Sequence, residues 1–243
     1  MTLDTEEPIA IAVVEAIHTG DIDGLQRLLA DNPDLAQERL GDDDPDGMSR
    51  SLLHVATDWP GNFPNVAATI ATLVEAGADV NARFAGPHTE TPLHWAASSD
   101  DVDALDALVA AGADLEATGA VIAGGTPLTD AVAFGQWHVA RRLVAHGAEP
   151  TFREAAALGQ PERVARACAT DPPPTRDELT QALWYACHGG QQPMAVLLLE
   201  QGADLNWVST WDQLTPLDAA ERSEAHDLVR WLKDRGAASA KGG

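Results

Sequence analysis

Basic residues and cysteines are scarce in this sequence of 243 residues. Lysine and arginine number 15 against 38 aspartates and glutamates, which gives a formal net charge of −23. Nucleic acid and anionic membrane are therefore not expected as partners, because contacts with phosphate groups depend on a basic surface. With only two cysteines, Cys168 and Cys187, a disulfide framework is excluded and a cytoplasmic location is expected.

Long apolar runs are missing as well. No stretch reaches the roughly 18 apolar residues that a membrane span needs, and the first eight residues are acidic and polar, unlike a secretory signal. Apolar residues nevertheless make up 45% of the chain, which is enough to build a hydrophobic core. A chain of this length forms one large domain or two small ones.

Two short motifs recur at fixed spacing along the chain. Gly-Ala-Asp followed by an apolar residue begins at Gly77, Gly112 and Gly202, with variants at Gly147 and Gly236. Thr-Pro-Leu begins at Thr91, Thr126 and Thr215. Each of these threonines lies 21 residues before one of the glycines, and the same spacing separates Gln181 from Gly202. A register that is kept over independent segments indicates a repeat architecture.

Each repeat has the local signals of two short helices joined by a turn. Threonine at the N-cap and proline at the first helical position start a helix, as at residues 91–92. The second helix carries an apolar stripe, for example Leu105, Leu108 and Val109. The glycine of Gly-Ala-Asp fits a left-handed C-cap. Since neither helix buries its apolar face alone, the repeats are expected to stack.

This pattern resembles the ankyrin repeat, which reads Thr-Pro-Leu-His-x-Ala-Ala, a helix pair, then Gly-Ala-Asp-x-Asn; residues 91–97 and 77–81 match it closely. The resemblance covers roughly residues 9–238. It implies an all-α ankyrin-repeat solenoid of stacked helix pairs with β-hairpin or loop projections, forming a single domain over residues 1–243. Seven units are predicted, with the first and last as caps. They start near Ile11, Ser51, Thr91, Thr126, Pro150, Gln181 and Thr215.

Two units depart from the pattern. The second has five additional residues in a segment around 59–64, where proline and glycine exclude a helix. The fifth, over residues 150–180, lacks both Thr-Pro-Leu-His and a preceding hairpin, and its first helix is rich in alanine. We expect the array to be weakest in the fifth unit, because the stability of such arrays is a sum over units and their interfaces.

Aromatic residues recur where the resemblance implies a partner-binding face, on the first helices and the hairpin tips. These positions hold seven of the twelve aromatic residues, namely Trp59, Phe84, Trp95, Phe134, Tyr185, Trp207 and Trp211. Asp58, Asp130, Glu154 and His188 are placed beside them. Any one aromatic is equally well explained as half-buried filling between helices. The set as a whole favours an exposed apolar groove, because such patches mark interfaces and Trp and Tyr dominate binding energy there.

Motifs for catalysis, nucleotide binding and metal binding are not found in the sequence. His54 and His94 lie in the framework position of the repeat, so the resemblance implies a structural hydrogen bond for each. The cysteines lack zinc-ligand spacing, and the acidic run at residues 42–47 lacks the spaced ligands of a calcium loop. We therefore predict that the protein binds no cofactor and no metal. The carboxylates near the groove are expected to be solvated or to face a partner.

The sequence thus predicts a protein–protein interaction module that binds a basic or mixed apolar/basic protein segment in an aromatic, acid-edged concave groove. The alternative is a small-molecule binder or atypical enzyme that uses the same groove. A closed pocket with a buried carboxylate near His188 favours that alternative, whereas an open trough favours a protein partner. A third possibility is a scaffold whose charge only maintains solubility. The oligomeric state stays open.

Overall fold

The computed structural model describes residues 2–41 and 47–240. The chain is 53% helical, which confirms the all-α prediction. It divides into two compact units, Met1–Ala148 and Glu149–Gly243, and each is described by itself. Organisation as a single domain stays a prediction. Residues 42–46 of the acidic run at 42–47 lie outside the described residues.

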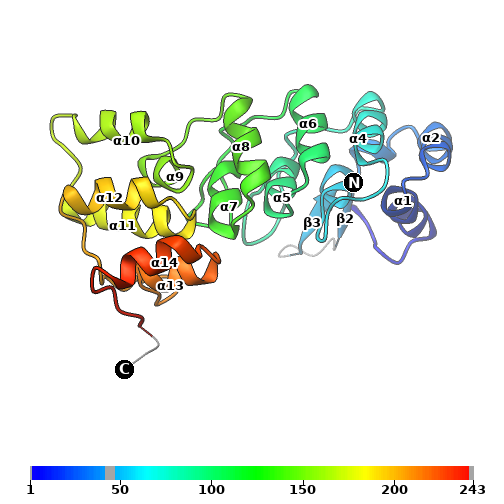
Figure 1. Cartoon of the computed structure of the whole chain (residues 1–243). Coiled ribbons are helices and arrows are strands. Elements are labelled where there is room, and N and C mark those ends of the chain that lie inside the picture. The colour runs from blue at the N-terminus through cyan, green and yellow to red at the C-terminus, as the bar shows by residue number, and fades with distance from the viewer. Residues whose placement is uncertain (1, 42–46, 241–243) are drawn as a thin grey trace. The chain divides into compact units, whose positions relative to one another are not determined.

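The N-terminal unit consists of consecutive helix pairs (Figure 1). Their helices are α1 (Pro8–Thr19), α2 (Ile22–Asp31), α3 (Leu52–Ala56), α4 (Val66–Glu75), α5 (Pro92–Ser98), α6 (Val102–Ala110), α7 (Pro127–Phe134) and α8 (Trp137–Ala145). The first helices of successive pairs pack in the order α1, α3, α5 and α7, and the second helices in the order α2, α4, α6 and α8. The stacking predicted from the repeats is thus present, and it buries the apolar stripe of each helix against its neighbours.

A small sheet accompanies the first two helix pairs. Its strands are β1 (Thr2–Leu3), β2 (Arg39–Gly41) and β3 (Ser49–Ser51), preceded by a short 3-10 helix at Leu35–Gln37. Strand β2 is parallel to β1 and antiparallel to β3. The Arg39 guanidinium ties the sheet to the next loop, because its Nη2 donates to the carbonyl oxygens of Ser49 (2.6 Å) and Arg83 (2.8 Å). The antiparallel β2–β3 pair confirms a hairpin projection.

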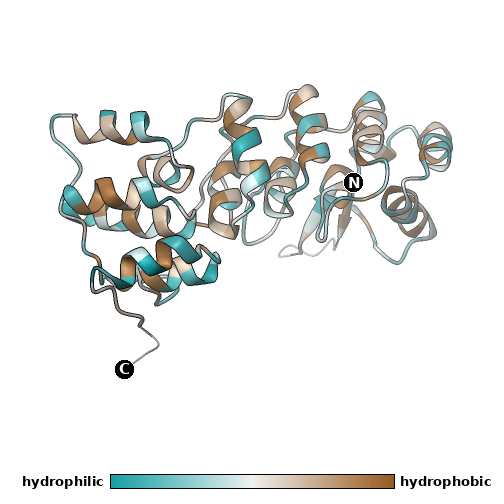
Figure 2. Ribbon diagram, viewed as in Figure 1, coloured by the Kyte–Doolittle hydropathy of each residue, from teal (hydrophilic) through white to brown (hydrophobic). Residues whose placement is uncertain are grey.

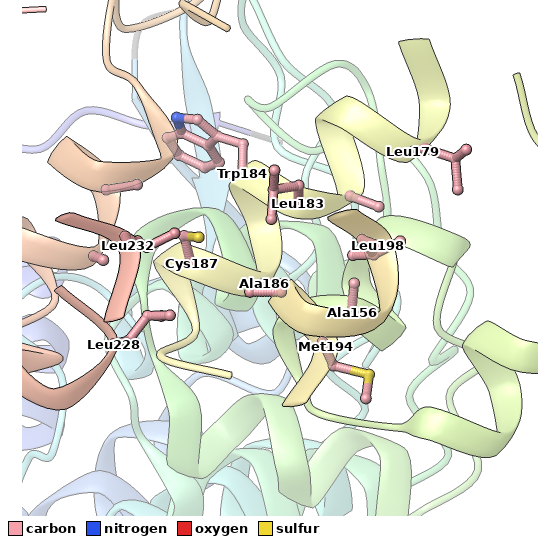
Figure 3. Packing of buried hydrophobic residues seen from close by; sticks show 14 of the residues in the cluster. Ala156, Leu179, Leu183, Trp184, Ala186, Cys187, Met194, Leu198, Leu228 and Leu232 are labelled. Carbon is pink, nitrogen blue, oxygen red and sulfur yellow. The ribbon is translucent and has the colours of Figure 1, made fainter. Parts of the chain in front are cut away.

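The C-terminal unit is built around one long helix. Its helices are α9 (Phe152–Ala157), α10 (Pro161–Cys168), α11 (Arg176–His188), α12 (Gln192–Glu200), α13 (Pro216–Arg222) and α14 (His226–Lys233). Helix α11 contacts α9, α12 and α13. Figure 3 shows Leu183, Trp184 and Cys187 of α11 in the same apolar cluster as Leu198 and Leu232. Figure 2 shows the same division of helices into apolar and hydrophilic stretches in both units.

The sixth repeat starts earlier than predicted. Helix α11 begins at Arg176 after an N-cap at Thr175, whereas the sequence placed this unit near Gln181. The backbone N–H of Thr175 donates to Glu178 Oε2 at 2.8 Å, which completes a capping box. The Thr-x-x-Glu pattern at 175–178 was the signal for this start, and it lies outside the 21-residue register that fixed the prediction.

The glycines of the recurring motif end the second helices as predicted. All of them have positive φ, which is the left-handed conformation that a C-cap needs: Gly77 (100°), Gly112 (95°), Gly147 (107°), Gly202 (98°) and Gly236 (84°). The loop around residues 59–64 is not helical, also as predicted. No helix in the described part of the chain is long and apolar enough to cross a membrane.

The framework histidines have the structural role that the resemblance implied. Nε2 of His54 lies 3.1 Å from the carbonyl oxygen of Glu90, and Nε2 of His94 lies 3.4 Å from that of Gly125. Each of these carbonyls belongs to the residue just before the next cap threonine. Burial lowers the pKa of His54 to about 3 and that of His94 to about 4, so both rings are neutral near pH 7.

Trp184 forms the corresponding hydrogen bond between repeats in the sixth repeat. Its indole Nε1 donates to the carbonyl oxygen of Leu214 at 3.2 Å, and Leu214 is again the residue before a cap threonine, Thr215. The bond links one unit to the next in the same place as the histidine bond. A tryptophan therefore replaces the framework histidine, and the sequence motif gave no indication of it.

Candidate functional site

The structure places the predicted site residues in two groups, one in each compact unit. The N-terminal unit holds Asp58, Trp59, Phe84, Trp95, Phe134 and Asp130. The C-terminal unit holds Glu154, Tyr185, His188, Trp207 and Trp211.

Three of the predicted aromatics line one pocket in the N-terminal unit. Trp59, Trp95 and Phe134 surround a hollow of about 220 Å³ that opens to solvent, and Asp58 and Glu90 contribute carboxylates to its wall. Trp59 is 82% exposed and Phe134 is 49% exposed. We call this hollow the aromatic pocket. Exposed rings that gather around one hollow favour an interaction site, because contiguous exposed apolar patches usually mark one.

The three rings come from different parts of the fold. Trp95 lies in the middle of α5, Phe134 is the last residue of α7, and Trp59 lies in the additional loop after α3. Helices α5 and α7 pack side by side, which brings their rings to one face. The loop is fixed to the next repeat because the backbone N–H of Asn62 donates to Asp101 Oδ2 at 2.6 Å. The departure of the second repeat from the usual length thus supplies one wall of the pocket.

Phe84 lies behind the pocket and does not line it. Its ring centroid is 5.6 Å from that of Trp95 and 6.4 Å from that of His54. His54 in turn packs edge-on against Trp95, with centroids 4.8 Å apart. Phe84 therefore supports the position of Trp95, which is the filling role that the sequence left open for any single aromatic.

Glu90 is a site residue that the sequence analysis missed. It is buried, and its carboxylate accepts hydrogen bonds from Trp95 Nε1 (3.1 Å) and from the backbone N–H of Val121 (3.3 Å). Its position just before the cap residue Thr91 was the available signal. That position has no fixed residue type in the repeat motif, so it drew no attention.

Asp130 corrects a prediction. It was expected to be solvated or to face a partner, but its side chain is fully buried, and neither carboxyl oxygen has a well-formed hydrogen bond to the described residues. Burial, followed by the negative charge of Glu90, raises the pKa of Asp130 to about 8, and the backbone amide of Ile122 opposes this shift only in part. The reason is the close packing of α7 on α5, which turns this side chain toward the preceding repeat.

Asp58 is at the edge of the aromatic pocket as predicted, but it is not a free charge. Arg50 Nη1 forms an ion pair with Asp58 Oδ2, and the backbone N–H of Trp59 donates to Asp58 Oδ1 at 2.8 Å. The carboxylate therefore fixes the start of the additional loop. The acid that contributes unbalanced charge to the pocket is Glu90.

The predicted aromatics of the C-terminal unit also come together. Ring centroids are 5.4 Å apart for Trp207 and Trp211, and 6.1 Å apart for Tyr185 and Trp211. Trp184, which the sequence analysis did not select, joins them at 5.1 Å from Trp211. We call these four residues the aromatic cluster.

Arginines of the same unit already cover this cluster. The guanidinium of Arg153 lies 5.6 Å from the ring centroid of Tyr185, and that of Arg222 lies 5.3 Å from the ring centroid of Trp184. Arg222 Nη1 is also 2.9 Å from Asp212 Oδ2, so an acid and a ring hold the same cation. The cluster thus forms its cation–π contacts within the chain.

Glu154 and His188 have structural contacts and are buried, unlike the predicted partner-facing side chains. Glu154 caps its own helix, because its Oε2 accepts the backbone N–H of Thr151 at 2.7 Å. Nδ1 of His188 lies 3.4 Å from both Arg222 Nη2 and Ser223 Oγ. Both residues sit on helices that pack against their neighbours in the stack, and this packing removes them from the surface.

Candidate metal ligands do not gather in the described part of the chain, where no group of three or more His, Cys, Asp and Glu side chains could hold an ion. Both cysteines are free thiols, and Cys187 is buried. Burial raises the pKa of the Cys168 and Cys187 thiols, which disfavours the reactive thiolate at neutral pH.

Comparisons with known proteins agree with the geometry. The family model described as ankyrin repeats (3 copies) matches residues 53–154 and 152–240. The crystal structure of the human ASB11 ankyrin repeat domain is similar in fold, with a TM-score of 0.53 and 24% sequence identity over 97% of this chain and 90% of that chain. No curated protein matches the sequence. Ankyrin repeats are generally protein–protein interaction modules without enzymatic activity. The chain belongs to the ankyrin repeat family.

Proposed function

We propose that the N-terminal unit binds a basic or mixed apolar/basic segment of a partner protein at the aromatic pocket. The observation that supports this proposal is the meeting of Trp59, Trp95 and Phe134 around one open hollow with a carboxylate in its wall. Large exposed aromatics form the anchors of protein interfaces, where a few residues supply most of the binding energy.

The charge of the chain supports a basic partner. A net charge of −23 attracts a basic segment over distance and speeds the encounter, while it repels acidic competitors. The contacts inside the pocket then determine how long the complex lasts. The predicted cytoplasmic location accords with this proposal and is part of it.

The alternative function, a small-molecule binder or atypical enzyme, calls for an enclosed site that buries most of a ligand. The aromatic pocket is open on one side and has an exposed ring, Trp59, at its edge. An extended segment of polypeptide suits such a surface better than a small molecule does. In the aromatic cluster only Trp211 is exposed, and arginines of the same unit already contact Tyr185 and Trp184.

A peptide display experiment tests the proposal on the full chain. A random library is selected on immobilised protein, and the affinity of the enriched peptides is measured by fluorescence anisotropy. The expected peptides combine basic and apolar residues. The double substitution Trp59→Ala with Phe134→Ala is expected to weaken them by about tenfold or more, because it removes two anchors.

Trp137→Ala is the matched control, since it removes a tryptophan from α8 of the same unit at a position outside the pocket lining. Its affinity is expected to equal that of the unaltered protein. Enrichment of acidic peptides, or full affinity in the Trp59/Phe134 double variant, would show that the aromatic pocket is not the binding surface.

A further inference from the structure

We propose that the aromatic pocket holds the guanidinium group of one arginine side chain of the partner, paired with the carboxylate of Glu90. This inference rests on the proposed function and assigns the chemistry of its central contact. Three observations carry it, namely the unbalanced charge at Glu90, the arrangement of rings around that charge, and the arginines that occupy the corresponding place in the C-terminal unit.

The Glu90 carboxylate has no cation among the described residues. The indole of Trp95 and the backbone N–H of Val121, both neutral donors, donate to it, and the carboxyl group of Asp130, neutral when protonated, is a further hydrogen-bonding neighbour. Asp58, on the same wall, differs because Arg50 already pairs with it. A buried carboxylate is expensive unless an opposite charge or several hydrogen bonds balance it. The wall of the pocket therefore has the charge that a cationic guest would complete.

Asp130 lies near Glu90 but does not balance its charge, because its raised pKa keeps it protonated and neutral near pH 7. It is fully buried near Glu90, and its two oxygens lack well-formed hydrogen bonds to the described residues. Glu90 acts on it as a like charge, which is one of the reasons that its proton is retained. Of these two carboxyl groups, Glu90 lines the pocket together with the three aromatic rings, and no arginine or lysine is among the lining residues. A cation in the pocket would balance the carboxylate of Glu90.

The rings around the pocket suit a guanidinium in particular. Cations are attracted to the faces of aromatic rings, most strongly to tryptophan. Guanidinium is planar and weakly hydrated, so it stacks on a ring and still donates to a carboxylate in the same plane. Trp59 and Phe134 supply exposed rings, and Trp95 holds the carboxylate in place. The ammonium group of lysine is more strongly hydrated and loses more on entering such a site.

The C-terminal unit has an arginine over the aromatic ring at the corresponding position, although a threonine, Thr180, stands there in place of Glu90. Trp95 directly follows the framework residue His94, and Tyr185 directly follows Trp184, which takes the place of that histidine in the sixth repeat. The guanidinium of Arg153 lies over the ring of Tyr185. The corresponding ring of the N-terminal unit, Trp95, carries no such arginine among the described residues. The fold thus places a guanidinium at this position in one unit and leaves it for a partner in the other.

Nuclear magnetic resonance of the tryptophan indole groups tests the assignment with defined probes. The probes are acetyl-Gly-Arg-Gly-amide, the same peptide with citrulline, which has the shape of arginine without its charge, and the same peptide with lysine. The indole N–H signal of Trp95 is identified by its loss in Trp95→Phe. The arginine peptide is expected to shift this signal to saturation, with a dissociation constant of about 1 mM.

The citrulline peptide is expected to bind at least about tenfold more weakly, because it keeps the contacts with the rings and loses the charge. Glu90→Gln keeps an oxygen that can accept from Trp95 and Val121, and it is expected to weaken the arginine peptide by a similar factor. Glu75→Gln, which removes a charge from the end of α4 outside the pocket lining, is the control and is expected to bind normally.

Two results would overturn the assignment. Equal binding of the citrulline peptide would show that the pocket does not recognise a cation, and this comparison uses the unaltered protein, so it holds even if Glu90→Gln unfolds. Tighter binding of the lysine peptide would exclude the preference for guanidinium. Neither result removes the proposed function, which fails if library-selected peptides are acidic or keep their affinity in the Trp59/Phe134 double variant.

Discussion

The indole Nε1 of Trp95 donates a hydrogen bond of 3.1 Å to the carboxylate of Glu90, and this contact joins the aromatic and acidic parts of the pocket. Phe84 and His54 pack against the same indole from behind. The ring is therefore fixed before any partner arrives, and so is the carboxylate. A pocket whose groups are already in place loses less conformational entropy on binding.

Replacement of Trp95 by phenylalanine tests the structural importance of this hydrogen bond. Trp95→Phe leaves Glu90 Oε2 without its indole donor, and an unsatisfied buried acceptor costs about 1–3 kcal/mol. We expect the free energy of unfolding, measured by urea denaturation, to fall by that amount. Trp59→Phe is the comparison and should change stability by less than about 0.5 kcal/mol, because Trp59 is largely exposed. Equal stability of the two variants would mean that the hydrogen bond contributes nothing.

Asp130 is expected to make the protein less stable as the pH rises. Its pKa is about 8 in the folded protein and 3.8 for an unperturbed aspartate, so the folded state binds the additional proton between these values. The stability that this proton provides is fully present below about pH 4 and is lost as the pH rises through about 8. Asp130→Asn removes the titration, so its urea midpoint should fall less between pH 5 and pH 8.

The difference between the two proteins is the informative quantity, because carboxyl groups that do not interact with Asp130 titrate equally in both. Asp106, Glu178 and Asp218 have lowered pKa values and give stability that increases with pH. Their contribution cancels when the unaltered protein is compared with Asp130→Asn. The same change in urea midpoint in both proteins between pH 5 and pH 8 would contradict a raised pKa for Asp130.

Hydrogen exchange is expected to be faster at residues 150–180 than at 91–145. Helix α9 buries mainly small alanines, and Val164 is the buried residue of α10. Helices α5 and α6 bury Leu93, Leu105 and Leu108, so they hide more apolar surface. The boundary between the compact units also falls at the start of the weaker segment. Mass spectrometry of the exchanged protein measures the exchange rate of each segment. Equal or greater protection at 150–180 would contradict the prediction that the array is weakest there.

Trp184 and Trp211 are expected to differ sharply in their effect on stability. Trp184→Ala removes a buried ring and the hydrogen bond to Leu214, which costs about 3–5 kcal/mol. Trp211→Ala should cost much less, since its side chain is 46% exposed. Thermal unfolding followed by circular dichroism compares the two variants. Similar losses would show that Trp184 does not have the framework role assigned to it.

The sequence was sufficient for the features that are determined within a single repeat. Threonine caps, first-turn prolines and left-handed glycines act on the residues next to them, so their spacing gave the helix pairs and most of their order. The same register placed Trp95 and Phe134 on one face, and Trp59 joined them through its unusual loop. The start of α11 was missed because Thr175 belongs to a local cap outside that register.

The tertiary structure decided the features that depend on neighbouring repeats. Asp130, Glu154 and His188 are buried because adjacent helices cover them, and a position in one repeat does not reveal what the next repeat places against it. Trp184 was missed for the same reason, since its partner Leu214 lies 30 residues away in the chain, and the contact of Glu90 with Val121 is equally distant, at 31 residues. Local signals therefore determined the backbone of each unit. Contacts between stacked units determined which side chains are buried, charged and exposed, because a side chain is buried only where a neighbouring surface packs against it.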